Sequence, residues 1–293
     1  MERLIYWIEA ARLKTLSASI TPVLIGSSLA YNQKNFQFSV FFYCLSFALL
    51  CQIGSNFAND YLDFERGVDN YRRKGPRRAV SSGLISLEAM RIASISILVV
   101  AFLTGLFLIP YGGYWLIIIG VASTFFAWSY TGGPYPLAYN GLGDIFVILF
   151  FGLIAVSTSF YTHTGTIDIL VIINALACGF MVNNLLVINN IRDREGDSFA
   201  GKKTSVVRYG SLFGKYLILT SCALGSLVSV VNAIILDSIF PLIGVVSILL
   251  CWMDLKKILT LKEYDDFVII LKKTGFYVFL YGISVSIGFI IRF

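Results

Sequence analysis

Residues 92–143 read IASISILVVAFLTGLFLIPYGGYWLIIIGVASTFFAWSYTGGPYPLAYNGLG and contain no Asp, Glu, Lys or Arg. A helix needs about 20 apolar residues to cross a bilayer, so this stretch is too long for a single crossing. It is interrupted by Ile109-Pro110-Tyr111-Gly112-Gly113 and by Thr131-Gly132-Gly133-Pro134, where Pro and Gly favour turns. The stretch therefore predicts several membrane-spanning helices joined by short turns.

The composition of the whole chain agrees with a membrane protein. Of its 293 residues, 57% are hydrophobic and 14% are charged, against roughly a quarter charged in soluble domains. The net charge of +6 does not indicate nucleic acid, because a membrane protein concentrates Lys and Arg in its cytoplasmic loops. Five widely spaced cysteines and one histidine predict neither a disulfide framework nor a zinc site.

The runs between charged residues predict an all-α protein with nine transmembrane helices, which fill the chain as a single domain, 1–293. The expected spans are 15–31, 36–58, 89–109, 114–130, 142–160, 168–189, 213–233, 238–253 and 274–291. With this arrangement, 21 of the 23 Lys and Arg residues fall on the amino-terminal side of the membrane. The positive-inside rule then predicts a cytoplasmic N-terminus and an outer C-terminus. The first residues lack the pattern of a cleaved signal or transit peptide, which favours a bacterial-type inner membrane. His163 is expected in an outer loop.

Seven of the 17 acidic residues lie in two short windows, each at the cytoplasmic end of a predicted span. In the first, helical spacing places four polar side chains on one face: Asn56, Asn59, Asp60 and Asp63. In the second, the same spacing groups Asn190, Asp193 and Asp197, with Asn189 one turn before Asp193. Two such faces at equal depth are expected to converge on one cavity.

Carboxylate and amide oxygens suit Mg²⁺, which commonly takes one or two carboxylates together with waters and substrate phosphate oxygens. A basic run adjoins each face, with Arg72, Arg73, Lys74, Arg77 and Arg78 after the first and Lys202, Lys203 and Arg208 after the second. Metal and cations together predict a diphosphate site. The alternative for each single Lys or Arg is a purely topological role, and for the faces a solvated helix end.

Five sequence blocks, in order along the chain, resemble those of the UbiA-type intramembrane polyprenyltransferases. The blocks are Ala11-Arg12-x-Lys14-Thr15-Leu16, Asn59-Asp60-Tyr61-x-Asp63-x-x-x-Gly67-x-Asp69, Gly75-Pro76-x-Arg78-Ala79-Val80, Tyr130-Thr131-Gly132-Gly133-Pro134 with Tyr139-x-Gly141-Leu142-Gly143, and Asn189-Asn190-x-Arg192-Asp193-x-Glu195-x-Asp197-x-x-x-Gly201-Lys202-x-Thr204. Within the family they look most like the branch that acts on 1,4-dihydroxy-2-naphthoate in menaquinone biosynthesis. The chain departs from the family pattern at Leu13, where proline is usual, and at Asp144, where glutamate is common.

The resemblance implies a reaction and a set of site residues. A polyprenyl diphosphate would be bound through Mg²⁺, lose diphosphate and transfer its prenyl group to a hydroxylated aromatic acid, with release of CO2 from the naphthoate. The implied catalytic residues are Asn59, Asp63, Asn190 and Asp193. The expected metal ligands are Asn59, Asp60, Asp63, Asp69, Asn190, Asp193 and Asp197. The expected substrate-binding residues are Arg78, Lys202 and Lys203 for diphosphate, Arg12 and Lys14 for the acceptor carboxylate, and Tyr130 or Tyr139 for the acceptor ring.

Two kinds of alternative stay open at this point. Within the same chemistry, the acceptor could instead be 4-hydroxybenzoate, homogentisate, chlorophyllide or a lipid glycerol. In a different class, a secondary transporter would use the acidic faces to bind a cation. Transporter sites generally lie near the bilayer midplane on broken helices, whereas these acids lie at one interface beside basic clusters, which favours the enzyme.

Overall fold

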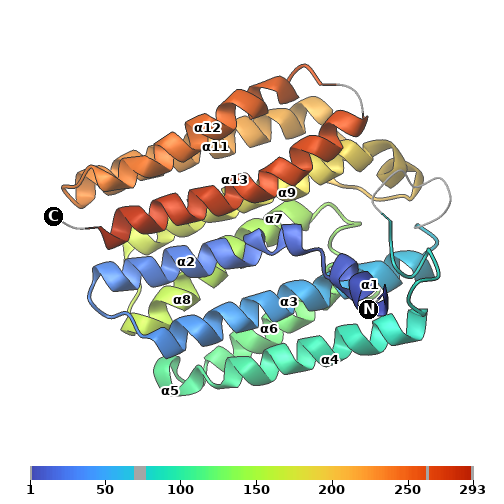
Figure 1. Ribbon diagram of the computed structural model, residues 1–293, viewed down its shortest axis with the longest axis horizontal. Helices are drawn as coiled ribbons and strands as arrows, with labels where there is room; N and C mark the ends of the chain where they lie inside the picture. The colour runs from blue at the N-terminus through green and yellow to red at the C-terminus, as the bar shows by residue number, and fades with distance from the viewer. Residues whose placement is uncertain (1, 69–76, 262–263, 292–293) are drawn as a thin grey trace.

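The computed structural model describes residues 2–68, 77–261 and 264–291, in which all regular structure is helical (Figure 1). The elements are α1 (Glu2–Ala11), η1 (Leu13–Thr15), α2 (Ser17–Asn32), α3 (Phe38–Glu65), α4 (Leu87–Leu106), α5 (Ile109–Gly112), α6 (Leu116–Ser129), α7 (Gly143–Val147), η2 (Ile148–Ile154), α8 (Ala155–Thr164), α9 (Ile169–Phe199), α10 (Ser205–Tyr209), α11 (Ser211–Ile235), η3 (Phe240–Leu242), α12 (Ile243–Ile258) and α13 (Tyr264–Ile290). The long helices run side by side, and the C-terminal ends of α3 and α9 lie at the end of the bundle that carries α1 (Figure 1).

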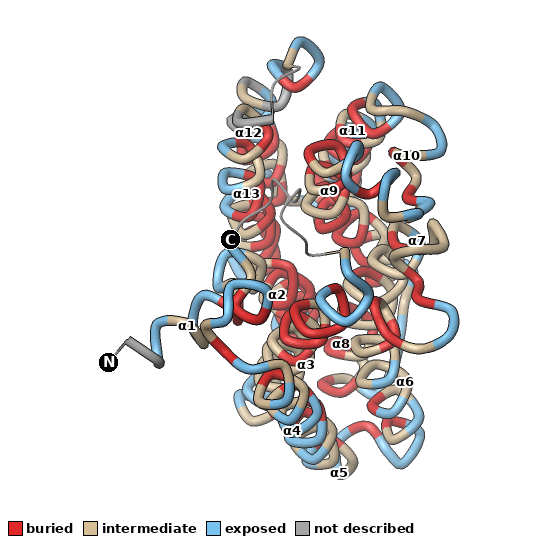
Figure 2. The backbone as a smooth tube through the Cα atoms, turned by 90° about the vertical axis from the view of Figure 1, so that its right-hand side faces the viewer, coloured by how far each residue is buried: buried red, intermediate tan, exposed pale blue. Residues whose placement is uncertain are grey.

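Six helical segments among the described residues are long and apolar enough to cross a membrane: α3, α4, the continuous α7–η2–α8, α9, α11 and α13. Their burial differs. The most apolar window of α9 is 67% buried inside the protein, whereas that of α3 is 17% buried. Figure 2 shows the same contrast between α9, which is largely buried, and the outward-facing α4. Apolar side chains that the protein leaves uncovered suit contact with lipid, so α9 forms the centre of a membrane bundle.

The predicted interruptions of residues 92–143 are confirmed. The Pro110 segment forms the short helix α5, which ends at Gly113 with φ 87°, and the helix α6 ends at Ser129 before the 131–134 turn. As expected for helices that leave the membrane, α3 continues beyond the predicted span end at residue 58 to Glu65, and α9 continues beyond residue 189 to Phe199. Backbone hydrogen bonding continues past the point where charges begin, so both acidic windows are helical, as their spacing predicts.

Two glycines allow the second half of the bundle to pack closely at a π-helical segment, η2. A Cβ at Gly152 would lie 2.5 Å from the carbonyl oxygen of Ala175, and a Cβ at Gly179 would lie 2.7 Å from that of Ile148. Any larger residue at either position would push η2 away from α9. π-helical turns are uncommon and often occur at functional sites. The position of η2 beside the central cavity therefore points to this cavity as the functional site.

The prediction for His163 is wrong, since this residue lies in the last turn of α8 and is 5% exposed. Its Nδ1 accepts the Gln37 N–H at 3.2 Å, and its Nε2 lies 3.1 Å from the Ser27 hydroxyl. The ring stacks on Phe36 with centroids 5.3 Å apart. The helix simply continues four residues beyond the expected span, and His163 ties it to α2 and to the loop that follows α2.

Candidate active site

One cavity of about 2070 Å³ runs through the interior of the bundle. Along α3 its lining residues share one face, from Cys44 through Gln52 and Asn59 to Asp63. At 1.5 Å per residue this face is about 28 Å long, close to the thickness of the hydrocarbon core. The far end is closed by apolar residues such as Leu108 and Leu116, while the near end carries the acidic faces of α3 and α9. The cavity therefore joins a polar mouth to a long apolar bore.

Asp63, at the polar mouth, is bound by three side chains from other segments. Its carboxylate accepts a hydrogen bond from the Tyr139 hydroxyl at 2.7 Å and another from the Arg78 guanidinium at 3.2 Å. The ammonium of Lys202 lies 3.7 Å from the same carboxylate. The Asp63 and Arg78 side chains are 6% and 11% exposed, so this ion pair is held largely away from water.

Lys202 joins the two acidic faces. Its ammonium lies 3.6 Å from Asp197 as well as 3.7 Å from Asp63, and it lies 4.7 Å from the centre of the Tyr139 ring. The loop that carries Lys202 follows α9 directly, and the Lys202 N–H donates to the Asp197 carbonyl. The expected convergence of the two faces on one cavity is thus observed.

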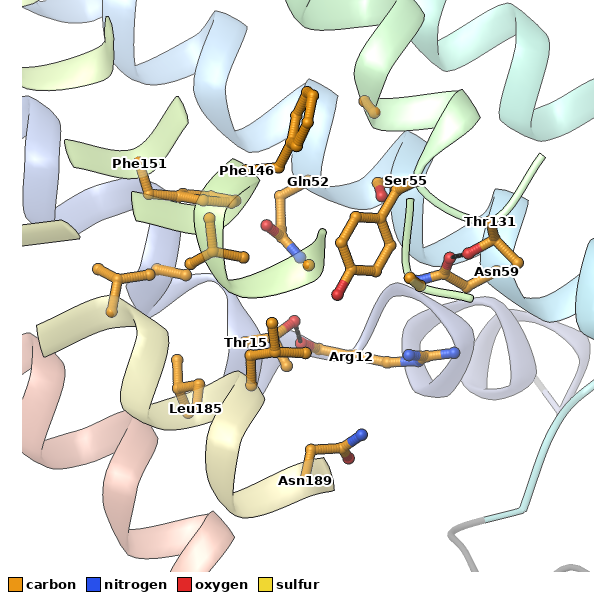
Figure 3. A pocket seen from close by; sticks show the side chains of 18 of the residues that line it. Arg12, Thr15, Gln52, Ser55, Asn59, Thr131, Phe146, Phe151, Leu185 and Asn189 are labelled. Atoms are coloured by element: carbon orange, nitrogen blue, oxygen red, sulfur yellow. Dashed lines mark hydrogen bonds between the residues drawn. The ribbon is translucent and has the colours of Figure 1, made fainter. Parts of the chain in front are cut away.

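On the second face, Asp193 is paired within its own helix. Nε and Nη2 of Arg192 donate to the two oxygens of Asp193 at 2.7 and 2.5 Å, and Nη2 also donates to the Asn189 side-chain oxygen at 2.7 Å. Asn189 lines the cavity, where Figure 3 shows its side chain, and Asn190 lines it too. Asn189 was missing from the expected site residues, although its spacing to Asp193 repeats that of Asn59 to Asp63.

The remaining residues of the first face have different surroundings. Asn59 accepts a hydrogen bond from the Thr131 hydroxyl at the cavity wall (Figure 3). Asp60 is 1% exposed, and its two oxygens accept the backbone N–H groups of Ala79 and Val80 at 3.1 and 3.0 Å. Because both oxygens bind backbone donors, Asp60 fixes the loop that carries Arg78. Asp60 also lines the cavity, and its expected role as a metal ligand stays a prediction.

The other expected residues are divided between the cavity and its surroundings. Arg12, Lys14 and Tyr130 line the cavity. Tyr139 does not line the cavity, but its hydroxyl donates a hydrogen bond to the Asp63 carboxylate. The Lys203 side chain is exposed and outside the lining, although its backbone N–H donates to the Tyr139 carbonyl. Asp69 lies outside the described residues.

The loop that carries Tyr139 depends on one glycine. Gly141 has φ 77°, and a Cβ there would lie 2.5 Å from the Lys203 carbonyl oxygen. Glycine adopts this backbone conformation without steric cost, and here it also admits the close approach of the Lys202–Lys203 loop. Arg208 adds a hydrogen bond of 3.0 Å to the Asn140 carbonyl. These contacts bring Tyr139 and Lys202 to Asp63 from separate parts of the chain.

The oxygen donors fit a shared hard cation better than a complete protein cage. Among the residues that the structure describes, no three His, Cys, Asp or Glu side chains are grouped closely enough to hold a metal ion. Mg²⁺ does not require such a group, because substrate phosphates and waters supply much of its coordination. Asp63 and Asn59 from α3, facing Asp193 and Asp197 from α9, match that pattern.

Comparison with known proteins identifies the class to which this fold and site belong. The model of the UbiA prenyltransferase family matches residues 19–273. The chain belongs to the UbiA prenyltransferase family.

Curated relatives are similar over most of their length. The 1,4-dihydroxy-2-naphthoate octaprenyltransferase of Haemophilus influenzae is 38% identical over 237 residues, which cover 76% of this chain and 75% of that protein. The protein of the same name from Mycobacterium leprae is 30% identical over 280 residues, covering 96% of this chain and 94% of that protein. Similarity to this named group thus extends across nearly the whole chain.

Solved structures support the same fold. A UbiA homolog from Archaeoglobus fulgidus, bound to GPP and Mg²⁺, superimposes with a TM-score of 0.68 at 14% identity and covers 96% of this chain and 99% of that one. A UbiA homolog from Aeropyrum pernix gives a TM-score of 0.67 at 12% identity. At these identities the likeness concerns the fold alone, and it agrees with the all-helical architecture expected from the sequence.

Proposed function

We propose that this protein transfers a polyprenyl group from polyprenyl diphosphate to 1,4-dihydroxy-2-naphthoate, giving demethylmenaquinone with release of diphosphate and CO2. The observation that carries the proposal is the pair of acidic faces that Lys202 joins at the mouth of an apolar bore. This arrangement suits a substrate with an anionic head and a long hydrocarbon tail. The names of the relatives indicate 1,4-dihydroxy-2-naphthoate as the acceptor and a polyprenyl chain as the tail.

We propose that Asn59 and Asp63 from α3, with Asp193 and Asp197 from α9, hold Mg²⁺ against the diphosphate. Asn189 and Asn190 line the same wall and complete the oxygen donors on α9, and Asp69 remains a proposed ligand on sequence grounds. The bound metal would neutralise negative charge on the departing diphosphate. The homolog from Archaeoglobus fulgidus that binds GPP and Mg²⁺ supports this use of metal in a protein of the same fold.

The chain's own cations have a matching task. Arg78 and Lys202 approach Asp63 at 3.2 and 3.7 Å, so both lie beside the proposed metal position, where they can bind diphosphate oxygens. Charge that develops on the leaving oxygen is stabilised most by donors that are already in place, and both cations are held by the carboxylate. The exposed Lys203 has no such position and is left out of the proposal.

The apolar wall would hold the tail and keep water from the allylic cation that forms when diphosphate departs. Phe126, Phe146 and Phe150 line the bore, and their rings pack together with centroids 4.9 to 5.9 Å apart. A dry wall at this point prevents water from competing with the aromatic acceptor. Arg12 and Lys14, at the opposite wall, are the proposed partners of the acceptor carboxylate, and Tyr130 lines the proposed ring pocket.

We also propose that the chain is one domain of nine spans with a cytoplasmic mouth. Besides the six long apolar segments, α2, α6 and η3 with α12 occupy the positions of the three remaining expected spans. They are short, at 16 and 14 residues for α2 and α6, which suits helices continued by turns at the interface. The acidic mouth coincides with the side that gathers the Lys and Arg residues, so the positive-inside rule places it in the cytoplasm.

The test is a product assay with membranes that contain the protein. Radiolabelled octaprenyl diphosphate and Mg²⁺ are incubated in parallel with 1,4-dihydroxy-2-naphthoate, 4-hydroxybenzoate or homogentisate, and the labelled lipid is extracted and identified. Demethylmenaquinone in the naphthoate reaction alone is the expected result. Product with another acceptor alone would overturn the acceptor, and no labelled product with any acceptor would overturn the reaction. Replacing Mg²⁺ with EDTA should abolish the product.

A further inference from the structure

Arg12 has an unusual backbone conformation at the joint between two helices. It separates α1, which ends at Ala11, from η1, which begins at Leu13, and its φ of 52° and ψ of 59° are left-handed. Residues with a Cβ rarely adopt this conformation, because the Cβ crowds the backbone. Arg12 also lines the cavity. A strained residue at a substrate cavity is a reason to ask what holds it there.

Two side chains bind the carbonyl groups on either side of Arg12. From α3, the Asn56 side-chain amide donates to the Ala11 carbonyl at 2.9 Å and to the Thr15 hydroxyl at 3.2 Å. The Thr15 hydroxyl in turn donates to the Arg12 carbonyl at 2.9 Å. The carbonyls before and after the Arg12 Cα are therefore both fixed, one by Asn56 and the other by Thr15.

Asn56 is itself immobilised. It is 3% exposed, and its side-chain oxygen accepts from Gln52 at 3.3 Å. Figure 3 shows Gln52, Thr15 and Arg12 around the same part of the cavity, with the hydrogen bond from Thr15 to Arg12 drawn. Both N–H donors and the oxygen of Asn56 are thus engaged, and such fully satisfied buried polar groups rigidify their surroundings.

We propose that Asn56 and Thr15 are positioning residues that hold Arg12 in its left-handed conformation and so direct it to the carboxylate of the aromatic acceptor. This inference rests on the proposed function. Asn56 lies seven residues before Asp63 on α3, about 10 Å deeper along the helix. Arg78 and Lys202 both form ion pairs with Asp63, at the mouth of the cavity. Only the backbone at Arg12 is anchored at this depth, and the Arg12 side chain extends from there toward the side of Asn59 (Figure 3). A further arginine on the cavity wall suits the second anionic group of the reaction, because guanidinium binds carboxylate in a directional, two-pronged manner.

The experiment compares Thr15→Val with Thr15→Ser. Valine removes the hydroxyl at nearly constant volume, whereas serine keeps it. For Thr15→Val we expect the KM for 1,4-dihydroxy-2-naphthoate to rise about 3- to 10-fold, the effect of one lost hydrogen bond, with little change in the KM for prenyl diphosphate. Thr15→Ser should restore the original KM. Thr124→Val is the matched control, because Thr124 donates to carbonyls of its own helix and does not line the cavity.

Two further comparisons separate positioning of Arg12 from general loosening of the fold. In an Arg12→Ala background, Thr15→Val should raise the acceptor KM no further. With 1,4-dihydroxynaphthalene, which lacks the carboxylate, Thr15→Val should behave like the unaltered protein. A full additional rise in the Arg12→Ala background, or a rise in the KM for prenyl diphosphate in place of the acceptor, would overturn the proposal.

A readout independent of turnover keeps this inference distinct from the proposed function. The Thr15 N–H donates to the Arg12 carbonyl at 2.8 Å, so hydrogen exchange of residues 11–16 reports the held conformation directly. Exchange should be faster in Thr15→Val and Asn56→Leu than in Thr15→Ser. Unchanged exchange in both would refute the positioning role even in an active enzyme, whereas inactivity of the unaltered protein with every acceptor would refute the proposed function instead.

Discussion

The acidic ends of α3 and α9 share one sequence spacing but have different surroundings. Each places an Asn four residues before an Asp, as Asn59 and Asp63 on α3 and as Asn189 and Asp193 on α9. Asp63 is bound by side chains from three other segments and is 6% exposed, whereas Asp193 is paired with the preceding Arg192 and is 21% exposed. Equal spacing therefore does not mean equal surroundings. The partners of Asp63 come from distant parts of the chain, whereas the counter-ion of Asp193 is the neighbouring residue of the same helix.

The difference has an energetic consequence. Removing one partner of a buried ion pair leaves the other charge uncompensated, which destabilises a protein more than loss of an exposed pair. Asp63 should therefore contribute to stability as well as to activity. Asp193 should contribute less to stability, because it is 21% exposed and its buried partner Arg192 also donates to Asn189. The predictions below test this contrast, from the largest expected effect to the smallest.

Asp63→Ala should give the largest loss. We expect turnover to fall at least about 1000-fold, because both a metal ligand and the organiser of Arg78 and Lys202 disappear. The melting temperature in detergent should also fall, since the largely buried Arg78 loses its ion pair with Asp63. Turnover is measured by radiolabelled product and melting by a thermal shift assay. Asp63→Ala with near-normal Mg²⁺-dependent turnover would remove this residue from the site.

Asp193→Ala should abolish most activity with a much smaller change in melting temperature. We expect turnover to fall about 100- to 1000-fold, as for loss of a principal electrostatic stabiliser. The melting temperature should fall less than in Asp63→Ala, because Asp193 is 21% exposed and the buried Arg192 guanidinium keeps its hydrogen bond to the Asn189 side chain. Equal destabilisation by the two substitutions would break the contrast between the faces.

Much of the fold follows from local sequence features. Charge-free runs mark where helices meet lipid, because each charged residue inside a bilayer costs free energy. The ends of α3 and α9 were harder to place, since helical hydrogen bonding does not stop where charges begin. His163 shows the same limit: four more helical residues turn an expected loop residue into a buried one.

Helical periodicity, which is local, identified the two acidic faces, and the family resemblance added Arg78, Lys202 and Tyr139. The pairing of these residues with Asp63 was not predicted, because such contacts join distant parts of the chain. Tyr139 reaches Asp63 across 76 residues of sequence, and Asn56 reaches Ala11 across 45. The role of Asp60 depends likewise on two backbone N–H groups in a distant loop. Pattern analysis can name candidate ligands, but it cannot say which carboxylates already have partners.

Lys202→Gln tests the connection between the faces. This substitution keeps a hydrogen-bond donor on a slightly shorter side chain but removes the charge that lies 3.7 Å from Asp63 and 3.6 Å from Asp197. We expect about a 10- to 100-fold loss in kcat/KM, chiefly through a higher KM for prenyl diphosphate. Lys203→Gln is the matched control, since Lys203 is exposed and outside the cavity, and its kinetics should be unaltered. Similar losses for both would indicate a general effect of loop charge.

Tyr139→Phe is the mildest test, because it removes a single hydrogen bond to Asp63 and leaves the ring in place. The ring still lies 4.7 Å from the Lys202 ammonium and 5.0 Å from the Arg66 guanidinium, so the loop should keep its position. We expect kcat to fall about 3- to 10-fold, the effect of one ordinary lost hydrogen bond, because Asp63 keeps its contacts with Arg78 and Lys202. In an Asp63→Asn background the same substitution should have a smaller effect, because the hydroxyl acts through the Asp63 charge. An undiminished effect there would mean that Tyr139 contacts substrate directly, and the α3 face would then be less preassembled than its hydrogen bonds indicate.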